Sequence, residues 1–193
     1  VEIYGSPRTP YDEYTIVVIG SGDNIRLGDL EGAYDVGQTG PDGLWSTGYL
    51  GDAFNASGYT LLLVTGFTGT AGTDLDADND GTLDSTPWAT VVDAIAVGDD
   101  ALQFFYTDVV LLPDFDGASV PAIAPFGASR IPDGVDTDTP GDWVRNSFLG
   151  AGLPVNDPSF NPNEAISTLS DPNLATIYGG ACGDPATLIS DVQ

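Results

Sequence analysis

The chain has 193 residues, of which 29 are acidic, four are basic and none is histidine, for a formal net charge of −25. The negative electrostatic field of such a chain repels phosphate backbones and anionic lipid, so we expect no nucleic acid and no membrane as partners. All four basic residues are arginine. Without histidine or lysine the usual general bases are missing and a Ser-His-Asp or Cys-His arrangement is impossible, so we expect a protein that is not an enzyme.

Composition also indicates a folded domain and its compartment. Apolar residues make up 41% of the chain, which is enough for a core despite the acidity. The single cysteine, Cys182, cannot form an internal disulfide, and both a buried thiol and a partner outside the chain fit it. No run approaches a membrane span, and neither a signal peptide nor a methionine precedes Val1. We expect a processed or truncated piece of a longer secreted precursor, located outside the cell or at its surface.

Short apolar runs separated by glycine and proline recur along the chain, and this pattern is typical of all-β domains. The strands predicted in this way are Val1–Tyr4, Tyr14–Ile19, Gly48–Leu50, Tyr59–Val64, Thr90–Val97, Ala101–Tyr106, Val109–Leu112 and Ala118–Ile123. Helical periodicity is weak, and Asn163–Leu169 behind Pro162 is the best candidate for a short helix or a turn. We predict a two-layer antiparallel β-sandwich, Ig-like or jelly-roll-like, over residues 1–150. Residues 151–193, rich in Asn, Asp and Pro, are predicted to form an extended C-terminal tail or linker.

The segment Asp74–Asp84 carries carboxylates on alternate positions and closes on a glycine, which is the order of oxygen ligands in a calcium loop. Counted from Asp76, Gly81 is at position 6 of this loop, where the chain must turn sharply. Pro87 replaces the bidentate glutamate of an EF-hand at position 12, and no helical pattern flanks the loop, so we predict a short DxDxDGxxD loop with a structural role. The alternative is a solvated acidic loop without metal. The predicted calcium ligands are Asp76, Asp78, Asp80, the Thr82 carbonyl and Asp84.

Several segments, taken in order, resemble one family. They are Val1–Gly5 with Tyr14–Val18, the Asp-rich loop running into Pro87-Trp88, Val91–Val97, Ala128–Gly134 and Asp142–Val144. Together they look like the lamin-tail-like β-sandwich of large secreted bacterial proteins, over about residues 1 to 150. The resemblance implies a non-catalytic module that often precedes other domains, including extracellular nuclease-type enzymes. The closing Cys182–Gln193 is similar to the linker that opens the following domain in such architectures.

The resemblance also suggests an open edge. Family members normally have a strand ahead of the segment that corresponds to Glu2–Tyr4, and a sheet that lacks this strand invites a strand from another chain. We therefore expect a calcium-stabilised structural subunit that self-assembles head to tail into an extracellular filament or surface layer. The connecting segment is predicted within Val155–Gln193 or around Val1–Tyr4. Its candidate apolar contacts are Leu169, Leu174, Ile177, Leu188 and Ile189.

The alternative function is a surface- or glycan-binding accessory module of a larger secreted enzyme, such as an extracellular nuclease. Stacking on sugar rings would require exposed aromatic side chains, although a core role suits most aromatics here better. The candidates for such stacking are Trp45, Tyr49, Tyr59 and Trp143.

Overall fold

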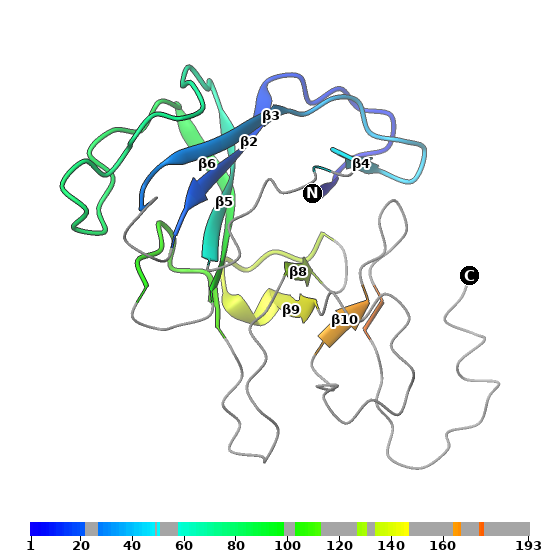
Figure 1. Ribbon diagram of the computed structural model, residues 1–193. Coiled ribbons are helices and arrows are strands. Elements are labelled where there is room, and N and C mark those ends of the chain that lie inside the picture. Colours follow the sequence, from blue (N-terminus) through cyan, green and yellow to red (C-terminus); the bar gives the residue numbers. More distant parts are fainter. Residues whose placement is uncertain are drawn as a thin grey trace, which may run out of the picture.

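The computed structural model describes residues 1–21, 27–48, 50, 58–98, 103–112, 127–130, 134–146, 164–166 and 174–175. Within these residues the protein is all-β: it consists of strands, turns and one 3-10 turn at Pro140–Asp142 (Figure 1). Two sheets pack together, which confirms the predicted β-sandwich. The described residues include no helix long and apolar enough to cross a membrane.

The main sheet has five strands in the order β3-β2-β5-β6-β7. Neighbours among the first four are antiparallel, whereas β7 runs parallel to β6. The interior strand β2 is an apolar and β-branched run that is buried along most of its length, as expected for a strand covered on both faces. The strands span Tyr14–Gly20 (β2), Leu30–Asp35 (β3), Gly58–Thr65 (β5), Thr90–Gly98 (β6) and Val110–Leu111 (β7).

Each face of the main sheet has its own apolar cluster, because successive residues of a strand point to opposite faces. The first cluster comprises Val17, Ile19, Leu30, Leu62, Val64 and Leu75. Leu75 comes from the long excursion between β5 and β6, so this excursion covers the first face. The second cluster comprises Val18, Tyr59, Ile95, Val97, Val109 and Leu111.

A second sheet covers the other face. Its order is β11-β10-β9-β8, and Ala128 of β8 and Trp143 of β9 pack against the second cluster. Strands β8 and β9 lie beside the main sheet in Figure 1. Strand β10 pairs with β9 in parallel, so the sheet crosses the boundary that the sequence predicted at residue 150. The strands span Gly127–Arg130 (β8), Trp143–Asn146 (β9), Glu164–Ile166 (β10) and Leu174–Ala175 (β11).

Two strands stand apart from both sheets. Strand β1 (Glu2–Tyr4) pairs with β4 (Leu44–Ser46) in an antiparallel ladder that joins Ile3 to Trp45. The segment that was expected beside an open edge is therefore paired within its own chain.

Several predicted elements were wrong. Glu164–Ile166 is strand β10 rather than part of a helix, because its backbone pairs with β9 and β11. Residues 103–106 lie in irregular structure, and Gly48 and Leu50 lie outside any strand. The predicted strand Ala118–Ile123 falls outside the described residues. Strand β3 was missed because Leu30–Asp35 carries a glycine and two acidic residues, which weaken the sequence pattern of a strand.

Candidate metal centre in the aspartate-rich loop

The aspartate-rich loop is closed at its base by backbone hydrogen bonds. The Leu75 amide donates to the Gly28 carbonyl (3.0 Å), and the Leu75 carbonyl accepts from the amides of Asp84 (2.7 Å) and Ser85 (3.3 Å). The Leu75 side chain is fully buried in the first cluster. The loop is therefore a closed ring that is anchored in the core by its first apolar residue.

Glycines allow the chain to reverse and to approach its neighbours. Gly81 has φ +87, in agreement with the sharp turn predicted there, and Asn79 also lies in the left-handed region with φ +56. Gly28 has φ +76, and a Cβ atom at this position would lie 2.5 Å from Cβ of Asp76. The turn at Gly28 therefore needs a glycine for the loop to sit against it.

Three of the four predicted carboxylates come together. Asp76, Asp78 and Asp84 each offer one carboxylate oxygen, and these oxygens all lie within 4.8 Å of one another. Asp76 is fully buried, whereas Asp78 and Asp84 are exposed. Asp80 is not part of this group, and its Oδ1 accepts a 2.8 Å hydrogen bond from the Thr82 amide. The loop therefore presents one buried and two exposed carboxylates around a common point.

Asp76 is the fixed member of the group. Its Oδ1 accepts from the Asp80 amide (3.1 Å), and its Oδ2 accepts from the Gly81 amide (3.0 Å) and from the Tyr106 hydroxyl (2.8 Å). Asp84 is held in turn by the Ala77 amide, which donates to its Oδ2 at 2.9 Å. Donors of this kind orient a carboxylate and stabilise its charged form.

The electrostatics of the loop reflect uncompensated negative charge. The neighbouring charge of Asp80, with smaller contributions from burial and Asp84, raises the pKa of Asp78. Burial, together with the hydrogen bond to Asp76, raises the pKa of Tyr106 above its ordinary value. The segment Asp74–Asp84 contains no basic residue. A cation bound among these carboxylates would relieve their mutual repulsion.

Sequence reasoning missed the segment that covers the loop. Phe104 lies against Gly81, where an added Cβ would meet its ring at 2.6 Å, and Tyr106 bonds to Asp76. Both residues had been assigned to a strand. The run Phe104-Phe105-Tyr106 is simply apolar and aromatic, so it carries no signal that would link it to an acidic loop.

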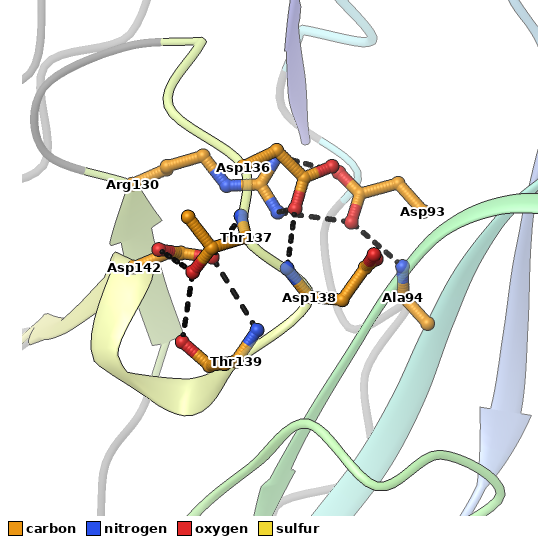
Figure 2. A network of polar contacts seen from close by, with 8 residues as sticks. All are labelled: Asp93, Ala94, Arg130, Asp136, Thr137, Asp138, Thr139 and Asp142. Atoms are coloured by element: carbon orange, nitrogen blue, oxygen red, sulfur yellow. Dashed lines mark hydrogen bonds and ion pairs between the residues drawn. The ribbon is translucent and has the colours of Figure 1, made fainter.

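A second polar cluster joins the two sheets (Figure 2). Arg130 of β8 donates to both carboxylate oxygens of Asp93 in β6, at 2.8 Å and 3.0 Å, and to Asp136 at 3.3 Å. Its guanidinium carbon lies 4.3 Å from the centroid of the Trp143 ring. In the sequence, Asp136–Asp142 is an acidic segment beside Trp143, and nothing in its spacing points to Arg130.

The aromatic residues considered for glycan stacking do not form a common platform among the described residues. Tyr59 is buried in the second cluster, and Trp143 is partly buried against the same cluster. Trp45 is half-buried in β4, where it pairs with Ile3. Tyr49 falls outside the described residues. The core role favoured by the sequence therefore fits Tyr59 and Trp143.

Comparison of the chain with protein-family models, with curated proteins and with solved structures finds no match. The resemblance to the lamin-tail-like β-sandwich therefore remains a prediction that rests on the motifs quoted above.

Proposed function

We propose that the loop 74–85 binds calcium and that the chain is a non-catalytic structural module whose sandwich is stabilised by this ion. The observation that carries the proposal is the convergence of Asp76, Asp78 and Asp84 within 4.8 Å. Calcium takes oxygen ligands at about 2.3–2.6 Å, so two oxygens on one ion lie at most about 5 Å apart. The spacing of the three carboxylates fits that limit.

The residues of the loop would have distinct parts in the site. Asp76 would supply a carboxylate that is held by three hydrogen bonds, and Asp78 and Asp84 would supply exposed oxygens that can adjust to the ion. The Thr82 carbonyl and Asp80 complete the predicted ligand set. Irregular oxygen ligands of this kind suit calcium better than magnesium, which requires near-ideal octahedral geometry.

Stabilisation follows from where the loop lies. Leu75 precedes Asp76 in the first cluster, and Leu83 precedes Asp84 and packs against the same cluster. Phe67 and Trp88, on either side of the loop, also pack there. An ion that offsets the repulsion among the carboxylates would therefore strengthen the cover over one face of the main sheet.

The proposal extends to location and assembly. Extracellular modules use calcium sites with dissociation constants of about 10⁻⁴–10⁻³ M, which suit the calcium concentrations outside cells. A chain with a net charge of −25 repels its own copies, and divalent ions reduce this repulsion. In the second sheet β11 is the edge strand, and it contains Leu174 of the segment predicted to connect subunits. We therefore propose head-to-tail self-association outside the cell.

Terbium luminescence tests the ion site, since Tyr106 bonds directly to Asp76 and can sensitise a bound lanthanide. Terbium should give emission on tyrosine excitation that calcium displaces, and calcium should raise the melting temperature. The variant Asp78→Asn combined with Asp84→Asn should lose both effects. Asp12→Asn, an exposed aspartate outside the loop, is the control and should keep both. Equal melting of the wild type in calcium and in chelator would contradict the proposal.

Sedimentation velocity tests the assembly. The intact chain with calcium should form larger species, and a chain that lacks residues 170–193 should remain folded and monomeric. If the intact chain sediments as a monomer at high concentration with calcium, the surface-binding accessory module becomes the better hypothesis.

A further inference from the structure

Among the side chains that the structure describes in the second sheet, two apolar ones pack against the main sheet. Of the described residues in β8 and β9, Ala128 and Trp143 pack against the second cluster, and both are only partly buried. Both side chains remove part of their apolar surface from water at this boundary. Polar contacts at the same boundary add to this attachment.

Arg130 makes the principal polar contact across the boundary. Its two terminal nitrogens bond both oxygens of Asp93, in the bidentate geometry that makes arginine–carboxylate pairs strong and directional. The side chains are 14% exposed for Arg130 and 26% exposed for Asp93, so water screens the pair only partly. Arg130 and Arg8 are the two arginines whose side chains the structure describes, and Arg8 is exposed elsewhere.

The same guanidinium also holds the turn that leads into β9. It stacks on Trp143 and bonds Asp136 at 3.3 Å, while Asp136 accepts from the Asp138 amide at 3.1 Å. Asp142 then fixes the rest of the turn: it accepts from the Thr137 amide at 2.7 Å and from the Thr137 hydroxyl at 2.8 Å. Figure 2 shows Asp93 and Asp136 beside Arg130, with Thr137 and Asp142 in the adjoining turn.

We propose that Arg130 is an acid-sensitive lock between the two sheets, and that its release at low pH detaches β8 and β9 from the main sheet before the main sheet unfolds. The detached state would uncover the second cluster, including Val18, Ile95 and Val97. At neutral pH the two sheets stay attached because the Arg130 guanidinium faces three carboxylates.

The sign of the pH dependence follows from these groups. The charged and titratable groups of the described residues that face Arg130 are Asp93 on β6, Asp136 in the turn and Asp142 before β9. The hydrogen bond from the Thr137 amide, followed by the Thr137 hydroxyl, the Thr139 amide and the charge of Arg130, lowers the pKa of Asp142 against the opposing effect of burial. A lowered pKa contributes stability that is present above the ordinary value near 4 and is lost as the pH falls through the folded value. Loss of the Asp142 contacts should loosen the turn that carries Asp136, so the lock should open below about pH 4.

Hydrogen exchange measured by mass spectrometry tests the lock, with rates corrected for their intrinsic pH dependence. As the pH falls from 7 to about 3, protection in 127–130 and 143–146 should drop at least about tenfold while β2 and β5 remain protected. Binding of a fluorescent apolar dye should rise over the same interval. Simultaneous loss of protection in all strands, or unchanged protection in 127–146, would overturn the proposal.

Three variants distinguish release of Arg130 from general unfolding in acid. Arg130→Gln should show the low protection of 127–146 already at pH 7, with little further change in acid. Arg8→Gln changes the net charge equally and should behave as the wild type. Should Arg130→Gln fail to fold, Asp136→Asn gives the same answer, since loss of the outer contact should move the opening to higher pH. An unshifted opening in Asp136→Asn would count against the lock.

Discussion

The hydroxyl of Tyr106 donates a 2.8 Å hydrogen bond to Oδ2 of Asp76, and so joins the segment before β7 to the buried carboxylate of the aspartate-rich loop. The Tyr106 amide also donates to Oγ1 of Thr60 at 3.2 Å. Thr60 shares a 2.9 Å hydrogen bond with Ser21 in the interior. Tyr106 thus connects the loop to the main sheet by two different groups.

Tyr106→Phe should lower the free energy of unfolding by about 1.5–3 kcal/mol, the usual contribution of a hydrogen bond to a charged group. The loss follows because Asp76 is fully buried and keeps only its backbone donors. Urea denaturation at neutral pH measures it. Tyr4→Phe removes a hydroxyl from a side chain that is 53% exposed and should have almost no effect. Equal stability of the two variants would show that the Tyr106 contact is unimportant.

Gly81→Ala should destabilise the protein more than Gly72→Ala. Both glycines have nearly the same φ, +87 and +88, so alanine meets a similar backbone penalty of about 1 kcal/mol or more at either site. Only at Gly81 would the added Cβ meet a neighbour, the ring of Phe104 at 2.6 Å, whereas Gly72 has nothing within 4 Å. Thermal unfolding of both variants, repeated in a Phe104→Ala background, should show the difference shrink. If the difference in stability between the two glycine variants persists without the Phe104 ring, it arises from the backbone and not from contact with the ring.

Leu75→Ala should cost about 2–5 kcal/mol, because it leaves a cavity in the first cluster at a fully buried position. It should also weaken calcium binding under our proposal, since Leu75 holds the base of the ring that carries Asp76. Leu83→Ala, at a partly buried position of the same cluster, should cost less. Denaturant titrations with and without calcium measure both effects, and the reverse order of the two variants would contradict the placement of Leu75.

Stability should fall in strong alkali. Burial raises the pKa of Tyr59 to about 12, against about 10 for an exposed tyrosine. Because the folded value is the higher one, the stabilisation is complete below pH 10 and is lost as the pH rises through about 12. The shift corresponds to roughly 2–3 kcal/mol at about 1.4 kcal/mol per unit. Circular dichroism from pH 9 to 12 should show a later transition for Tyr59→Phe, and an unchanged midpoint would argue against this role.

The strongest strands were predictable because their local pattern and their tertiary environment agree. Tyr14–Gly20 and Gly58–Thr65 are dense in β-branched and apolar residues, and the structure buries them in the centre of the main sheet. Residues 103–106 are rich in aromatic residues, which also favour strands, but they lie outside the sheet, since Phe104 and Tyr106 cover the aspartate-rich loop instead. Composition alone does not distinguish an apolar segment that pairs from one that packs over a loop.

The sequence by itself determined the all-β class, the acidic surface and the position of the sharp turn at Gly81, because these depend on residue type and on spacing along a few neighbouring residues. Only the tertiary structure decided that Asp76 is buried, that Asp80 lies outside the group of converging carboxylates, and that Arg130 reaches Asp93. Arg130 and Asp93 are 37 residues apart, and Tyr106 and Asp76 are 30 apart. Such contacts arise from how the sheets and their covers pack, and no local spacing in the chain records them.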